Sequence, residues 1–369
     1  MIPVQRPYLD KEEATAVEEV MQSGWLGMGA VTEEFEKALK EFLNADYVTA
    51  VNTGTSALHL ALDALELKPD DEVIVPSLTF AASPQAILAS GAKPVFCEVS
   101  PNTLNIDPND VVKKITDKTR VIMPVHFGGT PCELDEIMSI AQERNIRVIE
   151  DAAHAFGSKY NGKLIGSSGD ITCFSFDPIK NITCGEGGAV ITSDKELSEK
   201  IKNKRILGIS KDTWGRLNGK HSWFYDVLSP GYRYHMSNIN AAIGLEQLKK
   251  FEMFKRWKKE IAARYNQAFQ NLNGIRLRED NLNDTFPFFY VLRVLNNRRN
   301  EMMEYLKNRG IVTGLHYIPN HLHTLFYDSD ISLPVTESLY EEIITLPLYY
   351  EMTEEDVEKV ISTVTSFFQ

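Results

Sequence analysis

The regular alternation of short apolar runs with amphipathic stretches constrains the fold of this chain more than any other feature of its sequence. Helix-like segments at residues 56–65, 81–91 and 134–145 lie between runs that have the length and composition of strands. These predicted strands cover residues 47–53, 72–77, 93–100, 120–127, 147–153, 171–176 and 189–193. The rhythm is typical of βα units, so we expect an α/β fold with a mainly parallel sheet and helices on both faces. Ligands of such sheets bind outside the carboxyl ends of the strands, so residues that follow strands are the first site candidates.

The pattern changes near residue 241. Residues 241–272 predict one long helix, which could link the large domain to a smaller one. Residues 286–294 and 310–318 predict strands, and residues 354–368 predict a closing helix. We therefore expect a large domain over residues 1–245 and a small C-terminal α+β domain over residues 246–369.

Charge and cysteine content exclude several classes of function. The chain has 369 residues and a net charge of -12, so it lacks the basic surplus that a nucleic-acid partner requires. No apolar run reaches the roughly 18 residues that span a bilayer, and the N-terminal sequence has no signal-peptide pattern. Four scattered cysteines without CxxC pairs fit reduced thiols, so we expect a cytoplasmic protein with no membrane partner. The basic runs at 202–205 and 255–259 are predicted to be solvated helix faces.

The end of the first predicted strand carries small hydroxyl residues and a glycine, in the order Thr53-Gly54-Thr55-Ser56, directly before a helix. The free amides and the dipole of a helix start can bind a phosphate, and nearby hydroxyls can assist. Simple N-capping of the helix by Thr55 or Ser56 is the competing interpretation.

Two further strand ends carry charged residues. Asp151 follows an apolar strand, with His154 three positions later, and such a poorly solvated carboxylate needs a cationic partner. That partner is either a protein side chain or a protonated ring nitrogen of a ligand. Lys180 follows the strand that contains Ser175; it is either a solvated loop lysine or an amine nucleophile. A phosphate cradle, an acid and an amine at neighbouring strand ends are what pyridoxal phosphate (PLP) requires.

Longer segments carry a resemblance to a known family. The segments include SGWLGMGAVTEEFE, NTGTSALHLAL, PSLTFAAS, VIEDAAHAFGSKYNGKLIGSSGD, FSFDPIKNITCGEGGAVIT and GYRYHMSNINAAIGLEQL. In these the chain resembles the sugar aminotransferases of the DegT/DnrJ/EryC1/StrS family over nearly its full length. The resemblance implies the aspartate-aminotransferase-like PLP fold of type I, with PLP as the cofactor and a homodimer that shares its active sites.

The resemblance also implies roles for individual residues. Lys180 matches the catalytic lysine that binds the cofactor covalently, and Asp151 matches the acid at the pyridine nitrogen. His154 takes the place of the Gln or His beside the phenolic oxygen, and Phe80 matches the aromatic residue that stacks on the ring, although the sequence alone reads Phe80 as ordinary core. The phosphate ligands are expected to be Gly54, Thr55, Ser56 and Ser175, with Arg233 reaching the phosphate of the partner subunit. Many relatives have Asn and Arg where this chain has Arg233 and His235, so the residue that makes the cross-subunit contact stays open.

The reaction implied is transfer of an amino group from glutamate to a keto group of a nucleotide-linked deoxy sugar. The segments PVHFGGTPCELDEI and GYRYHMSNINAAI favour relatives that aminate C4, and C3 is the alternative. A PLP-dependent sugar dehydratase would have histidine at position 180, so the lysine argues against it. A noncatalytic PLP-binding regulator and a nicotinamide dehydrogenase are further alternatives, and the latter lacks a strand–GxGxxG–helix unit.

Two other motifs are set aside. His316, His321 and His323 have no common zinc spacing, so no metal site is predicted; in the related family this segment lies near the substrate. The glycine-rich segment 25–29 does not follow a strand, so it is not a dinucleotide fingerprint.

Overall fold

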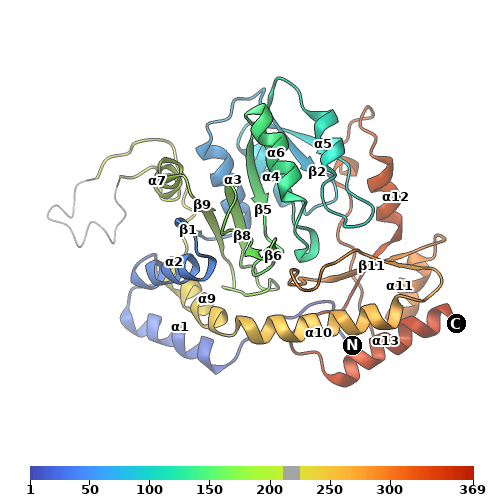
Figure 1. The fold of residues 1–369 in the computed structure, drawn as a ribbon. Coiled ribbons are helices and arrows are strands. Elements are labelled where there is room, and N and C mark those ends of the chain that lie inside the picture. Colours follow the sequence, from blue (N-terminus) through green and yellow to red (C-terminus); the bar gives the residue numbers. More distant parts are fainter. Residues whose placement is uncertain (211–224) are drawn as a thin grey trace.

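The main element of the molecule is a seven-stranded sheet, seen in the computed structural model of residues 1–210 and 225–369 (Figure 1). The strand order is β1-β9-β8-β5-β4-β2-β3. The strands are β1 (Tyr47–Val51), β2 (Glu72–Pro76), β3 (Lys93–Cys97), β4 (Thr119–Ile122), β5 (Arg147–Asp151), β8 (Ile171–Ser175) and β9 (Gly188–Thr192). Each overlaps a predicted strand, and β4 and β9 begin one residue before the predicted range, so all seven predictions are confirmed.

Strand direction brings three strand ends together. Strands β3, β2, β4, β5 and β8 pair in parallel, whereas β9 is antiparallel to both β8 and β1. Strand β1 therefore runs in the same direction as β8 and β5, and the carboxyl ends of all three meet at one edge of the sheet. The predicted mainly parallel sheet is confirmed.

Helices cover both faces of this sheet because its side chains alternate between two apolar cores. In β2, Val73 and Val75 face one core, while Ile74 faces the other. The first core is covered by α3 (Gly54–Ala64), α4 (Ala82–Ala89) and α7 (Lys195–Lys204). The opposite face is covered by α2 (Ala30–Leu43), α5 (Pro108–Lys114) and α6 (Leu134–Arg144).

A second, smaller sheet lies in the C-terminal part of the chain (Figure 1). Its antiparallel strands have the order β10-β11-β12, and the helices α10, α11 and α13 pack with them around an apolar core. The elements are β10 (Ile275–Leu277), β11 (Tyr290–Val294), β12 (Ile343–Leu346), α10 (Phe251–Phe269), α11 (Arg299–Lys307), α12 (Pro334–Glu342) and α13 (Glu354–Phe368). Short elements complete the fold: the hairpin β6 (Lys159–Tyr160) and β7 (Lys163–Leu164), and the 3₁₀-helices η1 (Phe127–Gly129) and η2 (Asn320–Leu322).

One predicted strand of this smaller unit is wrong. Within residues 310–318, only Ile311 and Gly314 make bridges, each with a single partner, Ile2 and Thr345. The segment leaves the sheet after these contacts and enters the wall of a cavity, so β12 takes the place of the predicted strand. The predicted boundary between residues 245 and 246 stays a prediction; it falls within α9 (Asn238–Lys249).

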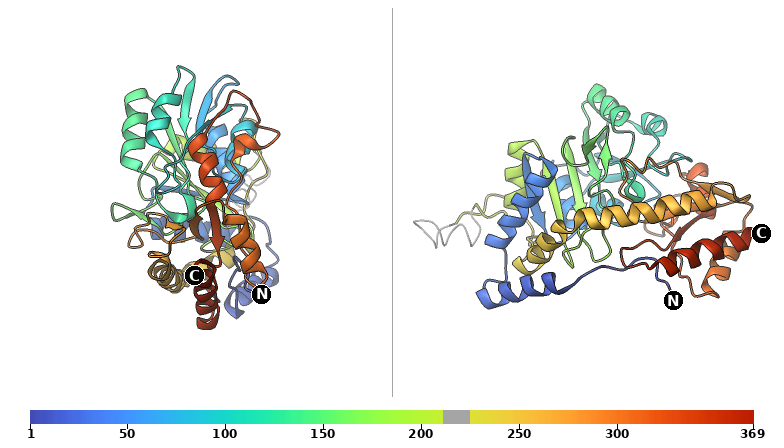
Figure 2. Two further views of the ribbon diagram at one scale, coloured as in Figure 1. Left: turned by 90° about the vertical axis from the view of Figure 1, so that its right-hand side faces the viewer. Right: turned by 60° about the horizontal axis from the view of Figure 1, so that its bottom comes forward.

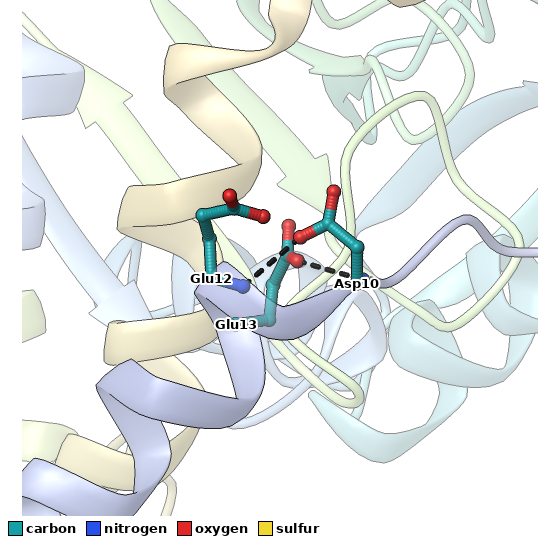
Figure 3. A group of neighbouring side chains, drawn as sticks. All are labelled: Asp10, Glu12 and Glu13. Atoms are coloured by element: carbon teal, nitrogen blue, oxygen red, sulfur yellow. Dashed lines mark hydrogen bonds between the residues drawn. The ribbon is translucent and has the colours of Figure 1, made fainter.

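The predicted long helix over residues 241–272 is two helices, because α9 ends at Lys249 and α10 begins at Phe251. Lys250 lies between them, and its Nζ is 2.5 Å from Asp10 and 2.8 Å from Glu13. Figure 3 shows these carboxylates with Glu12 at the start of α1 (Lys11–Ser23), where Asp10 caps the helix. This acidic group is the one set of potential metal ligands among the described residues, but Lys250 supplies its countercharge. We therefore assign it a structural role.

Both basic runs were predicted to be solvated, and each contains a buried side chain. Arg205 donates hydrogen bonds to Glu36 Oε1 at 2.5 Å and to the Ala50 carbonyl at 2.8 Å. Lys258 is also buried, on the inner side of α10. The prediction is wrong for these two residues because sequence pattern alone does not show which cation of a run faces a set of buried acceptors.

The long helix α10 extends from the seven-stranded sheet to the smaller sheet, and the two chain ends lie on the same side of the molecule (Figure 2). No helix within residues 1–210 and 225–369 is long and apolar enough to cross a membrane.

Candidate active site

A cavity of about 330 Å³ opens at the carboxyl ends of β1, β5 and β8, where parallel strands place ligand sites. Its volume is within the range of small-molecule sites. Seven of the nine predicted site residues line it: Gly54, Thr55, Phe80, Asp151, His154, Ser175 and Lys180. Residues far apart in the sequence therefore meet as the strand-end argument predicts.

The start of α3 forms one wall of the cavity. Thr53 caps this helix, and its Oγ1 accepts a hydrogen bond from the Ser56 amide at 3.0 Å. The amides of Gly54 and Thr55 have no partner within the helix, because the first amides of a helix lie beyond its hydrogen-bond ladder. A Cβ at Gly54 would lie 2.6 Å from Ser175 Cβ, so only glycine lets this turn approach the end of β8. The wall offers amides, hydroxyls and a helix dipole to an anion.

Asp151 lies in the cavity wall with its carboxylate held by two donors. Ser83 Oγ donates to Oδ2 at 2.7 Å, and the Ala153 amide donates to Oδ1 at 3.1 Å. The side chain is 5% exposed, and it has no ion-pair partner among the residues that the structure describes. Burial raises the pKa of Asp151, while its hydrogen bonds and the positive charge of Lys180 act in the opposite direction. The predicted alternative of a structural ion pair is thus not seen.

Lys180 lies in the same cavity, beyond the end of β8. Its Nζ is 4.3 Å from the centroid of the Phe288 ring. Desolvation lowers the pKa of Lys180 to about 8, although the nearby Asp177 and Asp151 carboxylates favour the charged form. A lysine amine with this pKa is partly free of its proton near neutral pH and can act as a nucleophile and a base. Because Lys180 lies in the cavity against Phe288, the alternative of a solvated loop lysine is not seen.

His154 is buried next to a tyrosine that the prediction did not include. Its Nδ1 accepts a hydrogen bond from the Gly128 amide at 3.4 Å, and its Nε2 lies 3.2 Å from Tyr317 Oη. Burial, followed by the charge of Lys180, keeps the pKa of His154 well below its ordinary value, so the ring is neutral. Since Nδ1 accepts, Nε2 carries the proton and donates to Tyr317. The hydroxyl proton of Tyr317 is therefore available to a ligand in the cavity.

Phe80 is 58% exposed at the cavity, with its ring centroid 5.6 Å from that of Tyr317. The interpretation of Phe80 as core, which the sequence alone favoured, is wrong. Ser56 is buried behind the cavity wall, where its hydroxyl donates to Asn52 Oδ1 at 2.7 Å. Arg233 is exposed and is not part of the wall.

Sequence reasoning missed several residues of the wall. Asp177 and Glu186 line the wall but are not among the predicted site residues, and Phe288 belongs to a segment that looks like an ordinary strand. His316 and Tyr317 belong to the HYIPNHLH segment, which was weighed as a metal site and which the resemblance places near the substrate, although Tyr317 was given no role. His316 instead bonds Thr345 through Nδ1 at 2.8 Å, and burial lowers its pKa to about 4.

The comparisons with known proteins agree over nearly the whole chain. The model of the DegT/DnrJ/EryC1/StrS aminotransferase family matches residues 7–365. The spore coat polysaccharide biosynthesis protein SpsC of Bacillus subtilis is 40% identical over 375 residues, which cover 98% of this chain and 96% of SpsC.

Solved structures agree with this match. PseC of Helicobacter pylori, an aminotransferase involved in the biosynthesis of pseudoaminic acid, is 30% identical with a TM-score of 0.93, covering 100% of this chain and 99% of PseC. The PLP-form of Spr1654 from Streptococcus pneumoniae is 30% identical with a TM-score of 0.92, covering 99% and 98% of the two chains.

Proposed function

Since the chain belongs to the DegT/DnrJ/EryC1/StrS family and is a PLP-dependent sugar aminotransferase, we propose that it transfers an amino group from glutamate to C4 of a nucleotide-linked deoxy keto sugar. The observation that carries the proposal is the meeting of Asp151, Lys180 and the start of α3 in one cavity. A buried carboxylate that has no ion pair within residues 1–210 and 225–369 fits a protonated ring nitrogen, and the helix start fits a phosphate.

Different residues of the cavity wall would hold different parts of the cofactor. Gly54, Thr55 and Ser175 would hold the phosphate, and Asp151 would hold the ring nitrogen. Phe80 would cover the ring, and Lys180 would bind the cofactor covalently. When bound, PLP supplies a ring that accepts electron density from the carbon next to the transferred nitrogen.

The chain itself supplies the proton transfer. Lys180 Nζ takes a proton from the donor carbon and returns one to the carbon that receives the amino group, as general base and acid. Its pKa of about 8 suits this exchange, because both protonation states are populated near neutral pH. Tyr317, whose pKa is raised strongly by burial, stays a neutral phenol that donates into the cavity.

The preference for C4 and for a nucleotide-linked sugar rests on the sequence segments quoted above. The names of SpsC and PseC support a role in glycan biosynthesis. The competing proposal is amination at C3 by the same groups, since both keto positions need the same proton transfer.

A homodimer with shared active sites belongs to the same proposal. Arg233 is exposed beyond the wall of its own cavity, which suits a contact with the phosphate in a second copy of the chain. Four cysteines, all free and buried, suit a cytoplasmic enzyme.

The first experiment is absorption spectroscopy of purified protein after addition of PLP. We expect the visible band of lysine-bound cofactor in the wild type and its loss in Lys180→Ala. A wild type without the band, or a variant that keeps it, would overturn the assignment of Lys180.

The second experiment measures 2-oxoglutarate released from glutamate with matched panels of nucleotide-linked 4-keto and 3-keto sugars. We expect product with the 4-keto panel. Product with 3-keto sugars alone would replace C4 by C3 and leave the assignment of Lys180 untouched.

A further inference from the structure

Lys258, on helix α10, is a buried lysine that the proposed reaction does not use. Its side chain lies on the inner side of the helix and is 5% exposed. Its Nζ donates to Asn181 Oδ1 at 2.9 Å and to the Phe288 carbonyl at 3.0 Å. No carboxylate among the described residues forms an ion pair with it. A buried amine without a countercharge is costly, so its retention calls for a reason.

Both acceptors belong to the surroundings of Lys180. Asn181 is the next residue in the chain, and its Nδ2 bonds the carbonyls of Phe156 and Phe286 at 3.4 and 3.3 Å. Lys258 thus joins helix α10 to the turn that carries the reactive amine.

The second acceptor, the Phe288 carbonyl, belongs to a residue whose ring packs against the Lys180 amine. The Phe288 ring has Lys180 Nζ 4.3 Å from its centroid and Lys258 Nζ 5.8 Å from it. The same ring stacks on His154 with centroids 4.5 Å apart. One amine therefore fixes both the residue after Lys180 and the ring against which Lys180 packs.

The lowered pKa of Lys258 is consistent with its two hydrogen-bond acceptors. Burial, followed by the positive charge of Lys180, lowers the pKa of Lys258 to about 7. A neutral amine has two N–H donors, which matches its two acceptors.

We propose that Lys258 is a positioning residue for Lys180, acting through Asn181 and Phe288. The inference rests on the proposed attachment of the cofactor to Lys180. Its role is to hold the Lys180 amine in one orientation toward the ring of the cofactor and the reacting carbon.

The test compares Lys258→Met with Lys255→Met in the PLP-loaded enzyme. Lys255 lies one turn earlier on the same helix and donates to the Gly157 carbonyl at 2.9 Å, a contact that does not involve the Lys180 turn. We expect Lys258→Met to fold, because a side chain of similar volume fills the space, but with a lower melting temperature than the wild type, because the buried Asn181 Oδ1 loses its donor.

In Lys258→Met we expect the absorption band of bound cofactor to persist while its induced circular dichroism per bound cofactor falls. We also expect kcat to fall about 100-fold, the effect of a misplacement of about 1 Å, with KM nearly unchanged. Lys255→Met should match the wild type in both readouts. A structural role alone would lower the melting temperature without changing the circular dichroism of the folded fraction.

A double-mutant cycle with Asn181→Leu tests the path of the effect. If Lys258 acts through Asn181, the double variant is no worse than the poorer single variant. The inference would be overturned if the fold-losses in kcat of the two single variants multiplied in the double variant. It would also be overturned if the induced circular dichroism of Lys258→Met equalled that of the wild type. Absence of the lysine-bound band from the wild type would instead overturn the proposed attachment at Lys180.

Discussion

At the scale of single residues, the environment of Lys180 predicts an unusual pH dependence. Its lowered pKa means that the amine is mostly protonated below pH 8 and mostly neutral above it, whereas an ordinary lysine makes this change near pH 10.4. In cofactor-free protein we expect an amine-reactive reagent to label Lys180 with a midpoint near pH 8, as measured by peptide mass spectrometry. The exposed Lys11 serves as the control for the reagent. A midpoint for Lys180 that coincides with that of Lys11 would contradict the desolvation argument.

The second prediction at this scale concerns Tyr317. The neutral His154 ring donates to its hydroxyl oxygen, so the hydroxyl proton is directed at whatever occupies the cavity. Tyr317→Phe removes one hydrogen bond of about 1–1.5 kcal/mol, so kcat/KM should fall about tenfold. Steady-state kinetics with Tyr327→Phe, whose ring is exposed, provides the matched comparison. Equal kcat/KM in the two variants would show that Tyr317 donates to no ligand.

Much of the site was predictable at this scale, because the strand ends of a parallel sheet bring their residues to one edge. Asp151, His154 and Lys180 were found on that ground and lie in one cavity. Phe288 and Lys258 were not found. An apolar strand residue and a lysine in a basic run carry no local signal, and only the tertiary fold turns them toward Lys180.

At the scale of elements, two threonine N-caps allow the effect of a cap on helix stability to be distinguished from its effect on cofactor binding. Thr53 caps α3 at the cavity, and Thr353 caps α13 in a capping box outside the cavity wall. Each Thr→Ala change should lower the free energy of unfolding by about 1 kcal/mol, measured by urea titration. Only Thr53→Ala should weaken PLP binding, because the start of α3 is the proposed phosphate site. Equal PLP affinity in both variants would show that the start of α3 does not bind the phosphate.

Helices and strands were predicted well where the hydrophobic periodicity was clear, and poorly where a tertiary contact determines the local structure. All seven strands of the large sheet follow from their apolar runs. The break at Lys250 carries no Pro or Gly; its side chain joins Asp10 and Glu13, which lie about 240 residues earlier. The segment 310–318 has the composition of a strand, but Gly314 makes only one bridge before the chain turns into the cavity wall.

At the scale of the whole molecule, the start of the chain belongs to the core of the smaller sheet. The Ile2 amide donates to the Gly310 carbonyl at 2.8 Å, and the Val312 amide donates to the Ile2 carbonyl at 2.9 Å. The Ile2 side chain is buried with residues of α10, β11 and α13. Ile2→Ala should therefore lower the free energy of unfolding by about 2–4 kcal/mol. Chemical denaturation measures this change, and Leu325→Ala, at an exposed position, is the control. An equal loss of unfolding free energy in both variants would contradict the prediction.

The origin of the cavity walls has a consequence for how such enzymes diversify. The groups of the cavity wall that are proposed to hold the cofactor precede residue 181, whereas Phe288, His316 and Tyr317 enter from the last third of the chain. Recombination between related genes at a point between these blocks would exchange the later wall and keep Asp151 and Lys180, provided that the new segment again supplies the contacts that Lys258 and Phe288 make around Lys180.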